Sequence, residues 1–234
     1  MSSTATAPPG RPILCLVLDG HTPLERAEAA LAGGVDWIQL RDRTLEAKPL
    51  YERAVALRAI ADRANKVDPK GVDRAAGPVR LLVNRRIDVA WAVGSDGVHL
   101  GYDALPTGEA RQLLGSASNS GWQIGVSTHA PAEVETARDA GASYAHLAPI
   151  FPPLSKAAGR PALGLDALRS ACGRGLPVLA QGGIEAENAA RVVEAGAAGV
   201  AVTGAILAAP DAEAAARALR DVLDGAIRAA RGAR

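Results

Sequence analysis

The chain has 234 residues, enough for one large α/β domain or two small ones, and its 48% apolar content is typical of a globular protein with a substantial core. Its 26 basic and 25 acidic residues leave a net charge of +1, which argues against nucleic acid or a membrane surface as the main partner. The two cysteines, Cys15 and Cys172, match no metal-binding spacing and are expected to be buried thiols.

The first twelve residues read MSSTATAPPGRP and lack the apolar core of a signal peptide or an anchor. We expect residues 1–12 to form a disordered leader and residues 13–234 to form one domain. No later apolar run reaches the length needed to cross a membrane, so the sequence predicts a cytoplasmic protein.

Short apolar runs alternate with helix-like segments along the chain. Runs stand at residues 13–18, 79–84, 122–127 and 177–181, and four more lie within the segments 29–40, 90–100, 137–150 and 193–206. In each of these four segments the end of a helix is followed by a glycine, which suits a left-handed helix cap, and then by the run. The runs are too short and too continuously apolar for surface helices, so we expect eight strands.

Eight apolar strands alternating with helices predict parallel pairing in an α/β protein, with both faces of the sheet covered. In one chain of this length, that number favours a single closed (β/α)8 TIM barrel over an open sheet. The chemistry of this fold lies at the carboxyl-terminal ends of the strands, so the residues at the strand exits are the candidates for a site.

Polar and cationic side chains follow several of the expected strands. The second exit carries Gln39, Arg41 and Arg43, the third carries Asn84, Arg85 and Arg86, the fourth carries His99 and Asp103, and the fifth carries Ser127 and His129. The loop after the sixth strand carries Lys156 and Arg160, which are either ordinary solvated charges or part of a lid that closes over an anion.

Glycines mark the exits of the last two strands. Gly182, Gly183 and Gly204 leave backbone N–H groups unobstructed just before a helix, and strands seven and eight are the usual phosphate site of such barrels. Tight strand-to-helix turns are the alternative explanation. Because glycines occur at two adjacent exits, we expect a phosphate-binding site there.

His129 directly follows a strand and is the best candidate for a general acid–base group, because imidazole titrates near neutrality. A lone histidine is more often structural, and we expect that role for His21, His99 and His146. His146 lies in mid-strand, where its imidazole would point into a core or a helix layer.

Six segments of the chain resemble the thiamine phosphate synthase family and its paralogues. They read WIQLRDR, LLVNRRIDVAWAVGSDGVHLG, IGVSTH, APIFPPLSK, GLDALR and VLAQGGIEAENAARVVEAGAAGVAVTGAI. They cover about residues 13 to 208 in the family's order. The resemblance implies a (β/α)8 barrel that handles the thiazole phosphate of thiamine biosynthesis.

The resemblance implies one of two activities. The synthase joins an aminopyrimidine diphosphate to thiazole phosphate with loss of pyrophosphate, using Mg²⁺. Its paralogue, the thiazole tautomerase, shifts a proton within thiazole carboxylate phosphate and needs no metal. By resemblance, the positions matching the synthase's pyrimidine and diphosphate contacts are Gln39, Arg41, Asn84, Ser127 and Lys156. His129 matches the acid–base histidine of the tautomerase, a position where synthases also often carry histidine.

Two positions depart from the synthase pattern, which reads Val-Asn-Asp-Arg at the third exit and Gly-Gln-Glu-Asp after the fourth. The two aspartates of this pattern resemble a metal-binding pair. Here Arg85 and Ala104 stand in their places, with Asp103 one residue away from the second. Because Mg²⁺ needs hard oxygen ligands, a guanidinium beside the site would repel it.

From these departures we expect a metal-independent thiazole tautomerase, an isomerase without a cofactor, in which His129 moves the proton. Arg41, Asn84, Arg85 or Lys156 would meet the substrate carboxylate, which an arginine fork matches with two hydrogen bonds. A thiamine phosphate synthase that uses Mg²⁺ and a non-catalytic paralogue that binds thiazole phosphate remain alternatives. We expect thiazole phosphate as the small-molecule partner, with no nucleic acid and no membrane, and a homodimer is compatible with this fold.

Overall fold

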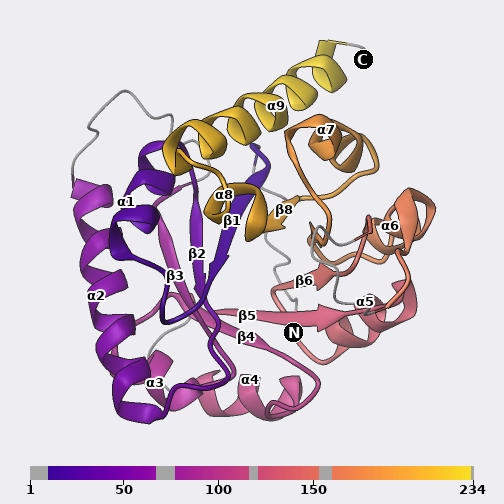
Figure 1. The fold of residues 1–234 in the computed structure, drawn as a ribbon. Helices are drawn as coiled ribbons and strands as arrows, with labels where there is room; N and C mark the ends of the chain where they lie inside the picture. Colours follow the sequence, from indigo (N-terminus) through magenta and orange to yellow (C-terminus); the bar gives the residue numbers. More distant parts are fainter. Residues whose placement is uncertain (1–9, 67–76, 116–120, 153–159, 233–234) are drawn as a thin grey trace.

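The computed structural model describes residues 10–66, 77–115, 121–152 and 160–232, which form a closed barrel of eight parallel strands surrounded by helices (Figure 1). The strands are β1 Ile13–Leu18, β2 Trp37–Leu40, β3 Arg80–Asn84, β4 Gly97–Leu100, β5 Gln123–Thr128, β6 Tyr144–Leu147, β7 Val178–Gln181 and β8 Gly199–Val202. The helices are α1 Leu24–Ala32, α2 Ala47–Lys66, α3 Ile87–Ala92, α4 Thr107–Gly115, α5 Pro131–Asp139, α6 Gly164–Cys172, α7 Ala186–Glu194, α8 Gly204–Leu207 and α9 Ala212–Gly232.

All eight expected strands and the (β/α)8 barrel are confirmed. The continuous apolar runs arise because each strand is covered on both sides. In β1, Leu14, Leu16 and Leu18 belong to the core between the sheet and the helices. Ile13 and Val17 alternate with them and pack inside the barrel. A strand with two buried faces does not alternate between apolar and polar residues, and the continuous apolar runs of the sequence show this pattern.

The strand register arranges the interior of the barrel in layers, to which alternate strands contribute four side chains each. Gln39 pairs with Leu82, and Asn84, two residues further along β3, pairs with His99 of β4. The same shift of two residues along the intervening strand relates β4 to β6 and β6 to β8. The even-numbered strands therefore contribute one layer near the carboxyl-terminal end, made of Gln39, His99, His146 and Ala201. This layer is mostly polar, whereas the apolar interior below it includes Trp37, Tyr144 and Leu179.

The opposite, amino-terminal end of the barrel is closed by a buried ion pair. Asp36, just before β2, accepts a hydrogen bond from the Leu14 N–H at 2.8 Å and one from Arg220 of α9 at 2.9 Å. The side chains of Asp36 and Arg220 are 3% and 4% exposed. Helix α9 packs against α1 and α7 and so brings the last part of the chain to the first strands (Figure 1).

The boundary between leader and domain expected at residue 12 stays a prediction, although Arg11 already contacts the domain. Arg11 is buried and donates two hydrogen bonds to Asp224 of α9, at 2.9 and 2.6 Å. Burial of a cation is costly unless the cation is paired, and these two hydrogen bonds supply that pairing. Residues 1–9 lie outside the described residues.

Neither cysteine forms a disulfide: Cys15 is buried and Cys172 is partly buried. Burial raises the pKa of both thiols, with a smaller effect of Asp36 on Cys15, so each is expected to stay protonated and unreactive. Among the described residues no helix is both long enough and apolar enough to cross a membrane.

Candidate active site

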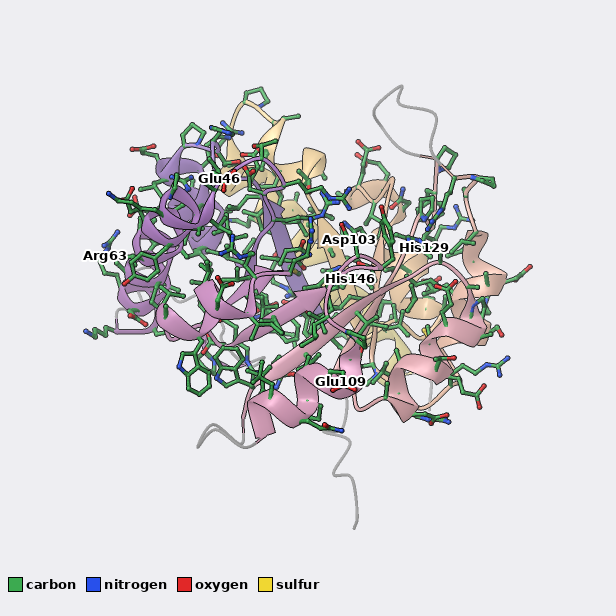
Figure 2. The ribbon with its side chains drawn as sticks, turned by 90° about the horizontal axis from the view of Figure 1, so that it is seen from below. Glu46, Arg63, Asp103, Glu109, His129 and His146 are labelled. Carbon is green, nitrogen blue, oxygen red and sulfur yellow. The ribbon has the colours of Figure 1, made fainter. Side chains whose placement is uncertain are left out.

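A cavity of about 600 Å³ opens at the carboxyl-terminal ends of the strands. Its lining residues come from β2 to β7 and from the segments that follow these strands. They are Gln39, Arg41, Arg43, Asn84, Arg85, His99, Gly101, Tyr102, Asp103, Ser127, His129, His146, Ala148, Pro149, Arg160, Gln181 and Gly182. In Figure 2, Asp103, His129 and His146 are grouped near the middle of the molecule, whereas Arg63 and Glu109 lie toward its outside.

The floor of the cavity is a hydrogen-bonded network on the inward faces of β4, β5 and β6. Nε2 of His99 lies 2.9 Å from the Ser127 hydroxyl, and its Nδ1 lies 3.1 Å from the Tyr144 hydroxyl. The His146 ring stands beside that of His99, with 4.2 Å between the ring centroids. Both histidines, for which a structural role was expected, line the cavity.

The floor is polar but uncharged. Burial lowers the pKa of His146 to about 3, an effect that a hydrogen bond with Gln181 partly opposes. Burial also lowers the pKa of His99 well below its ordinary value, and His146 and Arg41 lower it further. Both rings are therefore neutral near pH 7 and present hydrogen-bonding atoms without charge to a ligand.

Gly125 makes room for this network. A Cβ atom at this position would lie 2.1 Å from Cζ of Tyr144 and 2.6 Å from Nδ1 of His99. Gly125→Ala is expected to displace the tyrosine and to lower the free energy of unfolding by about 1–3 kcal/mol, as overpacked cores do. Urea denaturation measures this effect, with Gly108→Ala in α4 as the control, because nothing lies within 4 Å of the added methyl group there. Equal stability of the two variants would contradict this account of the floor.

The rim of the cavity is cationic. Arg41, Arg43 and Arg85 stand at the exits of β2 and β3 and line the cavity together with Asp103. An ion pair joins Arg85 to Asp103, with 3.3 Å between the nitrogen and the carboxylate oxygen. Burial of part of the Arg41 guanidinium lowers its pKa, and the neighbouring charges of Arg43 and Arg85 add to the shift while Asp103 opposes it. The rim therefore holds like charges close together, an arrangement that an anionic ligand would stabilise.

His129 lies at the edge of the cavity, directly after β5. Its Nδ1 is 2.8 Å from the carbonyl oxygen of Ala148. A carbonyl can only accept a hydrogen bond, so Nδ1 carries the proton. Nε2 of the neutral ring is then the basic nitrogen, as a general base requires. The backbone N–H of His129 donates to Glu133 at 2.7 Å, which fixes the start of α5.

The expected phosphate glycines are only partly brought to the cavity. Gly182 lines it and has φ +93°, and a Cβ atom there would lie 2.7 Å from Cβ of Pro149. Gly183 follows with φ +62°, a left-handed conformation that favours glycine. Gly183 and Gly204 are not among the residues that line the cavity. Phosphate binding at these glycines therefore stays a prediction, and Lys156 lies outside the described residues.

The cavity contains both residues that the sequence predicts for the site and residues that it does not. Those brought together as expected are Gln39, Arg41, Asn84, Arg85, Ser127, His129 and Gly182. His146 and Gln181 were not expected in the site, and His99, although it was placed at a strand exit, was expected to be structural. Their signal was the period of two along each strand: His146 follows the inward-facing Tyr144 by two residues, and Gln181 follows Leu179.

Known proteins resemble this chain over most of its length. A family model described as "Thiamine monophosphate synthase" matches residues 13–206. The thiamine-phosphate synthase of Methanoculleus marisnigri is 42% identical, over 86% of this chain and 88% of its own. That of Chlorobium luteolum is 40% identical, over 92% of this chain and 95% of its own.

Among solved structures, the thiamine phosphate pyrophosphorylase of Pyrococcus furiosus superposes with a TM-score of 0.77 at 27% identity, covering 94% of this chain and 98% of that protein. A 3-hexulose-6-phosphate synthase gives a TM-score of 0.62 at 20% identity, which shows the shared barrel fold alone. The match of the family model over most of the chain and the identities of 40% and more decide the relationship. The chain belongs to the thiamine monophosphate synthase family.

Proposed function

We propose that this protein is a transferase of thiamine biosynthesis, which joins an aminopyrimidine diphosphate to thiazole phosphate and releases pyrophosphate. The observation that carries the proposal is the 42% identity, over 86% of the chain, with a protein named thiamine-phosphate synthase. It takes the place of the tautomerase as the main proposal, because the named relatives are synthases.

The bond changes of this reaction need charge stabilisation more than proton transfer. The bond between the exocyclic carbon of the pyrimidine and the diphosphate oxygen breaks, and its electron pair leaves on that oxygen. The thiazole nitrogen donates its lone pair to the same carbon, so the product carries a thiazolium ring. No proton is gained or lost in this exchange. Groups aimed at the departing oxygen are therefore the main source of catalysis.

The cavity offers a suitable environment for each part of these substrates. Arg41, Arg43 and Arg85 would hold the diphosphate and stabilise the negative charge that develops as it leaves. The neutral floor of Gln39, His99 and His146 suits an uncharged heteroaromatic ring, because it can hydrogen-bond the ring without attracting an anion. The glycine turn after β7 would hold the phosphate of the thiazole.

Magnesium does not fit the residues that the structure brings together at this rim. Mg²⁺ is usually held by one or two carboxylates. Asp103 is the one carboxylate among the described lining residues, and it is already paired with Arg85. The proposed reaction is therefore assigned to the arginines, with no step that depends on a metal.

Thiazole tautomerisation is the second candidate, favoured by the orientation of His129. Its Nε2 is left basic by the hydrogen bond between Nδ1 and Ala148, as removal of a proton beside a carboxylate requires. The nearby arginines would bind the carboxylate and the phosphate of that substrate.

The two candidates make opposite predictions for His129→Gln. Loss of a general base is expected to slow tautomerisation about 10²- to 10⁴-fold. Formation of thiamine phosphate, which needs no proton transfer, is expected to fall less than about tenfold, within the loss of one hydrogen bond. Both reactions are measured side by side, each with and without a chelator. The control is His21→Gln, whose side chain is 71% exposed and is not part of the cavity lining.

Robust formation of thiamine phosphate by the wild-type protein supports the synthase proposal. Its absence, together with tautomerisation that is lost in His129→Gln, would replace the synthase with the second candidate. Neither reaction in a protein that still binds thiazole phosphate would favour the non-catalytic paralogue.

A further inference from the structure

We infer that the rim binds the diphosphate group of the substrate directly through guanidinium groups, with Arg85 in the place of a divalent metal ion. The identity of the ligand rests on the proposed function. The inference itself rests on the charge, the backbone and the ion pairing of the rim. These features make Arg85 a residue that decides how the site recognises its anion.

The charge of the cavity lining favours an anion over a cation. Four arginines, including Arg160, and a single aspartate are found among the described lining residues. The histidines of the floor add no positive charge, because burial keeps both rings neutral. A net positive surface repels a divalent cation. A diphosphate is attracted, because each guanidinium group can donate two hydrogen bonds to its oxygens.

The backbone of Arg85 is held in an unfavourable conformation. Its φ is +64°, and it is the one residue other than glycine with a positive φ in the described part of the chain. This left-handed conformation is costly for a side chain with a Cβ atom, and such strain is typically retained at functional positions.

Neighbouring hydrogen bonds hold this strained turn in place. The Arg85 N–H donates to the carbonyl oxygen of His99 at 2.9 Å, and the side-chain amide of Asn84 donates to the same oxygen at 3.1 Å. The Arg86 N–H donates to the carbonyl oxygen of Asn84 at 2.7 Å. The end of β3 is thereby tied to β4, and the arginine projects from a rigid edge rather than from a loose loop.

The partner of Arg85 is positioned to compete with a ligand. Asp103 lies 3.3 Å away, and the two side chains are 34% and 29% exposed. An ion pair that is open to water contributes little to stability, so a multiply charged anion can take the guanidinium from it. While the pair is formed, the carboxylate is not free to hold a metal ion.

Arg86 provides a matched control one residue away. It also follows β3, but its guanidinium donates two hydrogen bonds to Asp88, at 2.9 and 2.5 Å. It is not among the residues that line the cavity. Removing it changes the net charge of the protein by the same amount without changing the rim.

The test is calorimetric titration of the protein with inorganic pyrophosphate, in buffer containing either a chelator or Mg²⁺. The wild-type protein is expected to bind pyrophosphate at least as tightly in chelator as in Mg²⁺. Arg85→Ala is expected to weaken binding about tenfold to a hundredfold, the loss of a charge-assisted hydrogen bond. Arg86→Ala is expected to bind like the wild type.

Arg85→Gly separates the role of the side chain from folding. Glycine adopts a positive φ without strain, so this variant is expected to unfold at the same temperature as the wild type or above it. It is nevertheless expected to lose pyrophosphate affinity as Arg85→Ala does. Arg85→Asp is expected to bind pyrophosphate only when Mg²⁺ is present, because two carboxylates then face the rim.

Wild-type binding that disappears in chelator and returns with Mg²⁺ would overturn the inference. So would wild-type affinity in Arg85→Gly, or metal-independent binding in Arg85→Asp. Metal-independent binding by a protein that forms no thiamine phosphate would refute the proposed function and leave this inference standing. Metal-dependent binding by a protein that does form it would refute this inference alone.

Discussion

Replacing Asp36 with alanine is expected to lower the free energy of unfolding by about 1–3 kcal/mol, the cost of leaving buried hydrogen-bonding groups without their acceptor. The substitution leaves the Arg220 guanidinium, which is 4% exposed, without the carboxylate that lies 2.9 Å away, so that Asp224, at 2.7 Å, is its remaining ion-pair partner. It also deprives the Leu14 N–H of its acceptor. Urea denaturation monitored by circular dichroism measures the loss.

The control for Asp36→Ala is an ion pair at the surface. Arg63 and Glu28 also form an ion pair, but their side chains are 63% and 48% exposed. Arg63→Ala is expected to change stability by less than about 1 kcal/mol. The double variant Asp36→Ala, Arg220→Ala is expected to cost less than the sum of the single variants, since the contact between the two residues is then lost only once. Additive costs would show that the two residues act separately.

Stability is expected to fall steeply as the pH drops below about 6.5, because the folded protein holds two histidines neutral. The pKa of His146 is lowered to about 3, mainly by burial, and that of His99 is lowered in the same direction. In the unfolded chain both return to about 6.5 and bind protons first. The stabilisation is therefore complete above the unfolded pKa and is lost as the pH falls toward the folded one. The slope approaches about 1.4 kcal/mol per pH unit for each histidine.

His146→Gln tests this account of the acid limb. Removing one titrating group is expected to flatten the fall in unfolding free energy between about pH 6.5 and pH 5, a range above the titration of ordinary carboxylates. His21→Gln is the control, because the His21 side chain is 71% exposed. Denaturation curves at several pH values measure both variants. An unchanged slope in His146→Gln would contradict the lowered pKa of His146 in the folded protein.

The fold could be predicted from the sequence because burial on both faces leaves a continuous apolar signal. The run at residues 13–18 became β1 without any change of boundary, and the run at 177–181 became β7 after the loss of one residue. The residues at the end of a strand or directly after it were also predictable, since the barrel gathers all strand exits at one end. Arg41, Asn84 and His129 met in one cavity for that reason.

The contacts that the sequence could not predict depend on which residues face each other across the barrel. His99 and Tyr144 are 45 positions apart, and their hydrogen bond requires the register between β4, β5 and β6 and a glycine at 125. The positive φ of Arg85 accompanies hydrogen bonds to β4, and no local sequence pattern predicts these bonds. The pairing of Asp36 with Arg220 spans 184 positions and depends on where α9 crosses the first strands.

This last pairing orders the events of synthesis. Asp36 is synthesised 184 positions before Arg220, the cation with which it pairs inside the protein. Because a nascent chain grows from its amino terminus, the segments of β1 and β2 are synthesised before the cation that pairs with Asp36. We therefore expect the surroundings of Asp36 to reach their final form only after α9 has been synthesised, because Arg220 comes from that helix.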